Sequence, residues 1–442
     1  MEKGYRIVYQ SFDKANPGEI INQKILLEGD LNIPTNCFDI SMGLEKQIKL
    51  IQVTQDAVIC EKLEGLNQET EPCPKCKRQL AKCGKQNSTL HDVFTDHKVQ
   101  IQRVKCRGCG YEEPSTIRTL LDTTQTGDLQ KIQATLGASF SYRESEQVLA
   151  LFTGGNRGIN NHDRVKHVTE AVGAELESIN EDEKDIIVAN EADELVLNVD
   201  GGHIKTTEDK RSMEAMTSVI YDPKAVCTNS KGTRNYLSSK NCAASVKDDN
   251  QQQIISGTII AALKQGLTKN THITALCDGA ENCWNVAESL RPLCKEMTCI
   301  LDWFHLAMKL ENISLPKKVK SKLLRIKWHL WRGNVDKALT RLEQLILSAQ
   351  QEKHIKRIEK FRNYIANNRD KIVNYKERKK LKLIFTSNLA ESTVESLINR
   401  RCKGQQHMRW SREGLNPILQ LRAAINSKDD WSAKWKNAIL NA

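Results

Sequence analysis

Hydrophobic and polar positions along this chain follow two repeats, one typical of helices and one typical of strands. The helical repeat is found loosely over 42–66 and more clearly near 128–138, 142–152 and 162–178. Short apolar runs that predict strands follow at 195–199, 216–221, 254–262, 273–276 and 298–301. Because helical stretches follow several of these runs, we predict a mixed α/β domain in this part of the chain.

The last third of the chain combines a helical repeat with an excess of basic residues. Residues 311–384 contain no predicted strand, and a further helix is predicted at about 388–402. Residues 311–442 hold 30 Lys and Arg against 12 Asp and Glu, whereas the whole chain of 442 residues has a formal net charge of +11. The other residues therefore carry a net charge of −7. This distribution favours a polyanionic partner such as nucleic acid, with solvated helix faces as the alternative.

Composition and targeting signals narrow the class of protein. Hydrophobic residues make up 39% of the chain, and no apolar run is long enough to predict a membrane span. The first residues carry no apolar segment, so we expect no secretory signal and a cytoplasmic protein. The 14 cysteines are then expected to be reduced thiols or metal ligands.

Four of the cysteines form two CxxC pairs, Cys73 with Cys76 and Cys106 with Cys109. An alternating stretch at 91–105 predicts a hairpin between the pairs. Such paired turns are typical of one structural Zn²⁺ held by four thiolates, whereas Cys83 is expected to be a spare thiol. Basic residues surround the pairs, so both DNA contact and a purely folding role are open. A thiol redox enzyme is disfavoured because its CxxC is not expected in two matched copies.

Residues 142–170 resemble a helix-turn-helix. A helix at 145–152 precedes a glycine-containing turn and a second helix that carries Arg164 and Lys166. Many two-helix hairpins have the same pattern, so DNA contact by Arg164 and Lys166 is a hypothesis.

Two aspartates follow apolar strands and precede glycine. Asp200 follows the run at 195–199, and Asp278 follows the run at 273–276. Strands that deliver carboxylates to one edge of an α/β sheet can build a site for Mg²⁺, which prefers oxygen ligands. The alternative is that each Asp-Gly pair is an ordinary turn.

Further candidate groups lie beyond the third strand. Asp302 and His305 follow the run at 298–301 and could cap a helix or assist the site. Glu391 and Glu395 share a helix face at i, i+4 spacing. The amides, cations and aromatic residue at 403–414 suit a strand of nucleic acid.

Together these motifs resemble bacterial insertion-sequence transposases of the DDE superfamily, in the group whose RNase H-like domain is interrupted by an all-helical insertion. The resemblance covers roughly 71–425 and rests on four motifs: Asp200-Gly-Gly-His, Asp278-Gly-Ala-Glu-Asn-Cys-Trp, Asp302-Trp-Phe-His, and Ala390-Glu391-Ser392 leading to Gln-His-Met-Arg-Trp-Ser-Arg-Glu-Gly. It implies a multidomain α/β protein with an RNase H-like mixed sheet, a zinc ribbon and a helical DNA-binding domain.

The implied organisation runs in seven parts. These are an N-terminal segment without assigned role (1–70), a zinc ribbon (71–115), a helix-turn-helix-like DNA-binding domain (116–180), the first part of the catalytic domain (190–310), a basic helical insertion (311–384), the final part of the catalytic domain (385–425) and a tail (426–442). An acidic linker is expected at 181–194. The insertion accounts for the 112 residues between Asp278 and Glu391.

The resemblance also implies the roles of the candidate residues. Asp200, Asp278 and Glu391 would be the catalytic acids that hold two Mg²⁺ or Mn²⁺ ions, with Glu395 as the competitor for the third acid. Asp302 and His305 would assist or shape the site. The residues expected to contact DNA are Arg164, Lys166, Arg400, Arg401, Lys403, Arg409 and Arg412.

The implied function is cleavage and joining of double-stranded DNA at the ends of a mobile element. Action on two ends implies at least a homodimer on DNA, in the cytoplasm and associated with the nucleoid. Two alternatives stay open. One is an RNase H-like, metal-dependent nuclease without strand transfer, and the other is a non-catalytic zinc-ribbon DNA-binding regulator.

Overall fold

The computed structural model describes residues 3–37, 39–68, 72–114, 124–182, 186, 188, 190–209, 211–313, 317–403 and 408–441. They form two compact units, Met1–Val168 and Thr169–Ala442, and the boundary falls inside helix α5 (His162–Asp182). The residues 116–123 of the predicted DNA-binding domain, part of the predicted acidic linker and the motif residues 404–407 lie outside the described residues.

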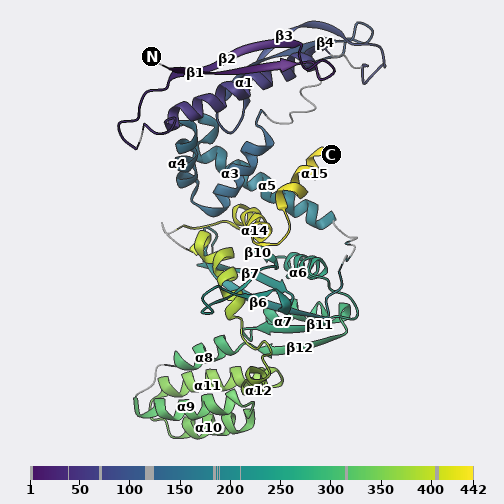
Figure 1. The fold of residues 1–442 in the computed structure, drawn as a ribbon. Helices are drawn as coiled ribbons and strands as arrows, with labels where there is room; N and C mark the ends of the chain where they lie inside the picture. The colour runs from purple at the N-terminus through teal and green to yellow at the C-terminus, as the bar shows by residue number, and fades with distance from the viewer. Residues whose placement is uncertain are drawn as a thin grey trace. The chain divides into compact units, whose positions relative to one another are not determined.

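The first unit begins with a hairpin that packs on a long helix (Figure 1). Strands β1 (Gly4–Phe12) and β2 (Ile20–Asp30) are antiparallel, and helix α1 (Leu44–Gln68) confirms the predicted helix near 42–66. Glu61 of α1 joins the two layers, because its carboxylate accepts hydrogen bonds from Tyr9 at 2.9 Å and Ser11 at 3.0 Å.

A three-stranded antiparallel sheet follows, in the order β3 (Ala81–His91), β4 (Asp96–Lys105) and β5 (Glu112–Pro114). The predicted hairpin at 91–105 is wrong in extent, because the whole of β3 precedes its turn at 92–95. Most of β3 is exposed and polar, so it lacks the apolar alternation that marks β4.

Three helices complete the part of the chain around the unit boundary, and they confirm the predicted helices there. They are α3 (Gly127–Ser139), α4 (Tyr142–Thr153) and α5, with the short turn η1 (Gly158–Asn160) between α4 and α5. Ser141 and Glu144 form a capping box at the start of α4, and Gly154 ends it with φ 70°.

The second unit is built on a five-stranded mixed sheet in the order β10-β7-β6-β11-β12. The strands are β6 (Glu194–Lys205), β7 (Ser212–Tyr221), β10 (Asn241–Ser245), β11 (His272–Cys277) and β12 (Glu296–Leu301). β6, β7 and β10 are antiparallel neighbours, whereas β11 runs parallel to both β6 and β12. A small hairpin of β8 (Val226–Thr228) and β9 (Asn235–Leu237) follows β7 and the turn η2 (Pro223–Ala225).

Two strand predictions are wrong in this unit. Residues 254–262 belong to helix α6 (Gln252–Lys264), whose buried residues Ile254, Thr258 and Ala261 recur at helical spacing. A short apolar run fits a buried strand and a buried helix equally, so the run alone could not separate them. Strand β6 also continues past Asp200 to Lys205, because its pairing with β7 continues there.

Helices surround this sheet and extend beyond it. They are α7 (Glu281–Glu288), α8 (Trp303–Glu311), α13 (Asn388–Val394), the π-helix η5 (Glu395–Lys403), α14 (Arg412–Asn426) and α15 (Trp431–Asn441), with the short turn η3 (Arg291–Leu293) before β12. Within the residues described, no helix combines the length and the apolar character that crossing a bilayer requires.

The basic stretch forms a group of helices beyond β12 and α8 (Figure 1). They are α9 (Lys317–Trp331), α10 (Val335–Leu347), α11 (Glu352–Asn367) and α12 (Tyr375–Lys380), with the turn η4 (Arg369–Lys371) before α12. The prediction that this stretch is helical is confirmed for the residues described. Trp331 stacks on Tyr375, with ring centroids 6.1 Å apart, inside the group.

The contact between α5 and α14 leaves no room for a side chain at Gly173, where an added Cβ would lie 2.1 Å from the carbonyl oxygen of Pro417. We expect Gly173→Ala to lower the free energy of unfolding of the second unit by about 1–3 kcal/mol. Urea denaturation checks this value. Gly65→Ala on α1 is the control, since nothing lies within 4 Å of an added Cβ there. A Gly173→Ala variant as stable as the native chain would contradict this packing.

Candidate metal centres

The register of two parallel strands places Asp200 and Asp278 side by side. Val199 of β6 pairs with Cys277, the last residue of β11; Asp200 follows Val199 on β6, and Asp278 directly follows the end of β11. β11 ends there in a turn through Gly279, which has φ +94°. Both aspartates line one small pocket of the second unit.

Glu391 and His305 reach the same pocket from two helices. His305 lies in the first turn of α8, and Glu391 lies in the first turn of α13. One ligand atom each of Asp200, His305 and Glu391 lies within 4.8 Å of the others. Three segments that are far apart in the sequence therefore converge on a group that could hold a metal ion.

Asp302 fixes the two helices to each other. Its buried carboxylate caps α8 by accepting the backbone N–H of Phe304 at 3.2 Å. The same carboxylate accepts the N–H of Ser387 at 2.9 Å and its hydroxyl at 2.7 Å, at the start of α13. Asp302 also lies 3.7 Å from His305 Nε2. These contacts give Asp302 the capping role that the sequence left open.

Glu395, the competitor for the third acid, lies outside this pocket. Its side chain is exposed, and its carboxylate accepts a hydrogen bond from Asn399 on the same helix. Of the two glutamates, the structure brings only Glu391 together with Asp200 and His305.

The carboxyl groups in the pocket perturb one another. Burial raises the pKa of Asp200, and the negative charge of Asp278 adds to this rise, while His305 and Lys403 oppose it. Burial also raises the pKa of Glu391, with a further contribution from Asp200. A cation bound between them would relieve this repulsion. Carboxylate oxygens suit Mg²⁺ and Mn²⁺, and transition-metal ions also accept an imidazole nitrogen.

Asp278 forms an ion pair with Lys309. Its carboxylate lies 3.5 Å from Lys309 Nζ and accepts the backbone N–H of Ala280 at 2.9 Å. It lines the pocket without belonging to the group of ligand atoms formed by Asp200, His305 and Glu391.

The two glycines after Asp200 give charged side chains room beside the backbone. An added Cβ at Gly201 would lie 2.6 Å from Glu214 Oε1, and one at Gly202 would lie 2.8 Å from Lys403 Nζ. Lys403 therefore approaches β6 closely, where its charge acts on Asp200.

The segment that brings Lys403 there is a π-helix, a form that occurs often at functional sites. The buried Arg422 of α14 supports it by donating to the carbonyl oxygen of Leu397 at 2.8 Å and to that of Ser396. Trp410 Nε1 donates to the carbonyl oxygen of Cys402 at 3.3 Å.

The residues predicted to contact DNA differ in exposure. Those that lie exposed are Arg164, Lys166, Arg400, Lys403 and Arg409. Arg401 is only 2% exposed, and its guanidinium carbon lies 4.9 Å from the Trp410 ring centroid, so DNA contact by Arg401 stays a prediction that this burial disfavours. Arg412 is partly buried. Its guanidinium forms ion pairs with the carboxylates of Glu208 (Nε to Oε2, 3.4 Å) and Asp248 (Nη2 to Oδ2, 3.8 Å). Arg400, the residue before Arg401, is exposed, because consecutive residues of a helix face different sides.

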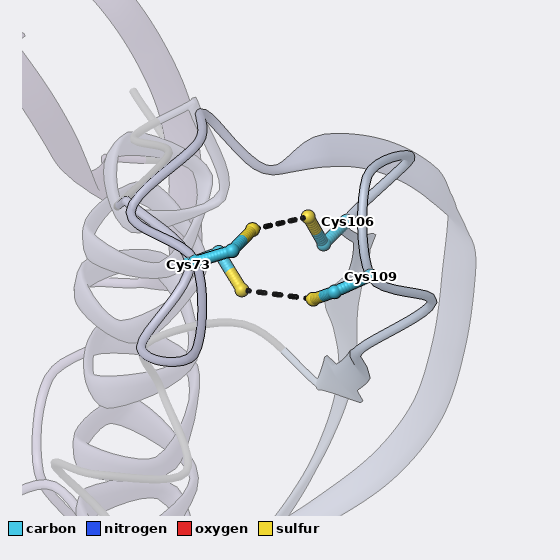
Figure 2. Close-up of side chains that lie close together, drawn as sticks. Cys73, Cys106 and Cys109 are labelled. Atoms are coloured by element: carbon cyan, nitrogen blue, oxygen red, sulfur yellow. Dashed lines mark hydrogen bonds between the residues drawn. The ribbon is translucent and has the colours of Figure 1, made fainter.

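A second candidate metal centre lies in the first unit. The sulfurs of Cys73, Cys76, Cys106 and Cys109 all lie within 4.8 Å of one another, and two turns face them inward (Figure 2). The Cys73 and Cys109 sulfurs are 3.6 Å apart, and those of Cys76 and Cys106 are 3.3 Å apart. A tetrahedral Zn²⁺ with Zn–S bonds of about 2.3 Å would set sulfurs about 3.8 Å apart, close to this spacing.

Backbone N–H groups favour the thiolate of Cys106, whereas the net shift of the Cys76 pKa is in the opposite direction. The N–H groups of Cys109 and Gly108 lower the pKa of Cys106 to about 6. The N–H of Arg78 acts to lower the pKa of Cys76, but the adjacent Cys106 sulfur and burial raise it to about 11. Cys83 is exposed and is not part of this group, as expected for a spare thiol.

The chain matches the sequence model of a protein family. The sequence model of an uncharacterised protein family, UPF0236, matches residues 131–438, about seven tenths of the chain. The matched region includes the pocket of Asp200 and Glu391 and leaves out the four-cysteine group. No curated protein matches the chain.

We expect the four-cysteine group to hold about one zinc ion per chain, because four soft thiolates in this arrangement suit Zn²⁺. Metal analysis of the purified chain checks this number. Cys106→Ser should lose the zinc, whereas Cys83→Ser, the matched control, should keep it. Zinc retained by Cys106→Ser would contradict the assignment.

Divalent metal binding in the pocket should be pH dependent. Because the pKa values of Asp200 and Glu391 are raised, both carboxyls hold protons to a higher pH than usual, and a cation must displace them. Mn²⁺ affinity should therefore rise, with proton release, as the pH increases through and above the range in which ordinary carboxyl groups titrate. Because the raised pKa values mean that the folded state binds these protons more tightly than the unfolded state, the metal-free unit should lose stability as the pH rises through these pKa values.

Calorimetric titration with Mn²⁺ in two buffers of different ionisation enthalpy measures both the affinity and the released protons. Asp200→Asn is the control that removes one of the titrating groups. An Mn²⁺ affinity that does not change across this pH range would refute the role of these carboxyls.

Proposed function

The chain belongs to the uncharacterised protein family UPF0236, and we propose that it is a DNA transposase that cleaves and joins DNA at the pocket of Asp200, Asp278 and Glu391. The observation that carries the proposal is the convergence of Asp200, His305 and Glu391 on one point, with Asp278 lining the same pocket. The acids are spread over almost 200 residues; the pairing of β6 with β11 and helix α13 bring them together, and α8 adds His305.

The topology of the sheet supports an RNase H-like catalytic domain. Three antiparallel strands, β6, β7 and β10, are followed by two strands parallel to β6, with β6 in the centre. The helices α9 to α12 lie between β12 and α13 in the chain, which is the place of an all-helical insertion. We assign residues 311–384 to this insertion.

The residues of the pocket would divide the work of phosphoryl transfer. Asp200, Glu391 and His305 would hold divalent cations, with Asp278 completing the set of carboxylates. Such cations, when bound, would supply the activation of a water or a 3′-hydroxyl as nucleophile and the stabilisation of the leaving oxygen. Asp302 keeps α8 and α13 in place, so that His305 and Glu391 stay directed at the pocket.

Positive side chains around the pocket would hold the DNA backbone. Lys403 lies beside Asp200, and Arg400 and Arg409 are exposed on the same part of the chain. Cations placed next to an acidic metal site can bind phosphates on either side of the scissile bond. The long-range attraction of the basic insertion would add to this binding without sequence preference.

The first unit would supply recognition of DNA. We propose that the four cysteines bind the zinc ion of a zinc ribbon. We also propose that α4 and α5 form a helix-turn-helix whose exposed Arg164 and Lys166 contact DNA. Since a transposase acts on two ends, at least two copies of the chain would assemble on DNA.

The proposal predicts that Asp200→Asn abolishes DNA processing. Loss of a metal-holding carboxylate should reduce cleavage by at least about a hundredfold. The substrate is a supercoiled plasmid that carries the gene with its flanking DNA, and gel analysis and sequencing of the products give cleavage and joining separately. Glu395→Gln, one helical turn from Glu391 and outside the pocket, is the matched control and should act like the native chain.

The outcomes separate the alternatives. Joined products made by the native chain and lost in Asp200→Asn support a transposase. Cleavage without joined products would favour the nuclease. Unchanged processing by Asp200→Asn would overturn the catalytic role of the pocket and favour a non-catalytic regulator.

A further inference from the structure

Asp278 differs from the other two acids in how it is held. Asp200 lies inside the ladder of β6 and β7, and Glu391 lies in helix α13. Asp278 lies in the turn after β11, beyond the last ladder pair of that strand. The position of its carboxylate therefore depends on whatever packs against this turn.

The group that packs against the turn comes from the helical insertion. Tyr364 of α11 donates its hydroxyl to the carbonyl oxygen of Asp278 at 2.7 Å. Asn368, at the C-terminal end of α11, donates to the carbonyl oxygen of Gly279 at 3.3 Å. Two consecutive carbonyl groups of the turn are thus bound by residues 86 or more positions away in the chain.

These donors are themselves fixed. Asn368 is 3% exposed, and its Oδ1 accepts the indole N–H of Trp284 at 3.0 Å. Its amide group also donates to the carbonyl oxygen of Tyr364 at 3.0 Å. Trp284 lies on α7, the helix that follows the turn. The turn is therefore enclosed between its own following helix and the end of α11.

Lys309 completes the enclosure from α8. Its ammonium donates to the Asp278 carbonyl oxygen at 3.2 Å and lies 3.5 Å from the Asp278 carboxylate. The same ammonium lies 4.3 Å from the centre of the Tyr364 ring, a cation–π contact. Tyr364 therefore orients the turn. It also orients Lys309, the cation that pairs with the Asp278 carboxylate.

The fit leaves the turn little freedom to move. An added Cβ at Gly279 would lie 2.6 Å from Tyr364 Cε2 and 2.9 Å from Leu301 Cδ1. The left-handed φ of +94° at this residue also favours glycine. The Asp278-Gly279 motif is thus a turn shaped around the ring of Tyr364.

We propose that Tyr364 and Asn368 are positioning residues for Asp278, so that the helical insertion is required to complete the metal centre. This inference deepens the proposed function and rests on it. Hydrogen-bond partners that orient metal-holding groups commonly change metal affinity by about ten- to a hundredfold when removed. The insertion then does more than add positive charge for DNA, because it fixes one of the three acids.

The test is Mn²⁺ titration of the full chain by calorimetry, which needs no DNA substrate. Tyr364→Phe removes one hydroxyl and keeps the ring, and we expect Mn²⁺ affinity to fall about tenfold. Asn368→Ala acts on the neighbouring carbonyl and should weaken Mn²⁺ binding in the same direction. Circular dichroism and thermal melting report whether each variant is folded.

Tyr375→Phe is the matched control. Tyr375 is also a buried tyrosine of the insertion, but its hydroxyl donates to the carbonyl oxygen of Leu301 at 2.7 Å, at the end of β12. It should lose stability through the lost hydrogen bond and keep the native Mn²⁺ affinity.

The possible results separate the two proposals. The positioning role is supported if the native chain and Tyr375→Phe bind Mn²⁺ equally well, while Tyr364→Phe and Asn368→Ala bind it more weakly. Equal Mn²⁺ affinity in the native chain and in folded Tyr364→Phe overturns the positioning role and leaves the proposed function standing. Equal losses in Tyr364→Phe and Tyr375→Phe also overturn it, in favour of general destabilisation. A native chain that binds no Mn²⁺ overturns the metal-dependent function and the positioning role together.

Discussion

The parallel pairing of β6 with β11 is the constraint on which the rest of the second unit depends. It sets Asp200 and Asp278 at the same level of two neighbouring strands, in a pocket that also contains Glu391. Burial raises the pKa of Asp200 and of Glu391, and the negative charge of a neighbouring carboxylate adds to each rise. A fold that keeps such a group must compensate it with positive charge.

The surrounding elements supply that compensation in different ways. Lys309 pairs with Asp278, and Lys403 uses the space above Gly202 to approach Asp200. Asp302 holds α8 against α13, which keeps His305 and Glu391 at the pocket. These contacts place positive charge and two fixed helices around the carboxylate group.

The residues of the site could be predicted from the sequence better than the residues that surround it. Asp200 and Asp278 could be predicted because apolar strands and glycines mark them locally, and CxxC spacing marks the four cysteines in the same way. The role of Tyr364 could not be predicted, since its partner lies 86 residues away and no local pattern records that contact. The strand predicted at 254–262 is a helix, because a short apolar run fits a buried helix and a buried strand equally. The burial of Arg401 depends on its contact with Trp410, which no local pattern records.

The most direct test of the central claim is anomalous diffraction from crystals of the full chain soaked in Mn²⁺. The account predicts an anomalous peak bounded by the side chains of Asp200, His305 and Glu391, with the carboxylate of Asp278 turned toward the same pocket. A pocket without an anomalous peak in such crystals would contradict the claim that these acids form a divalent metal centre.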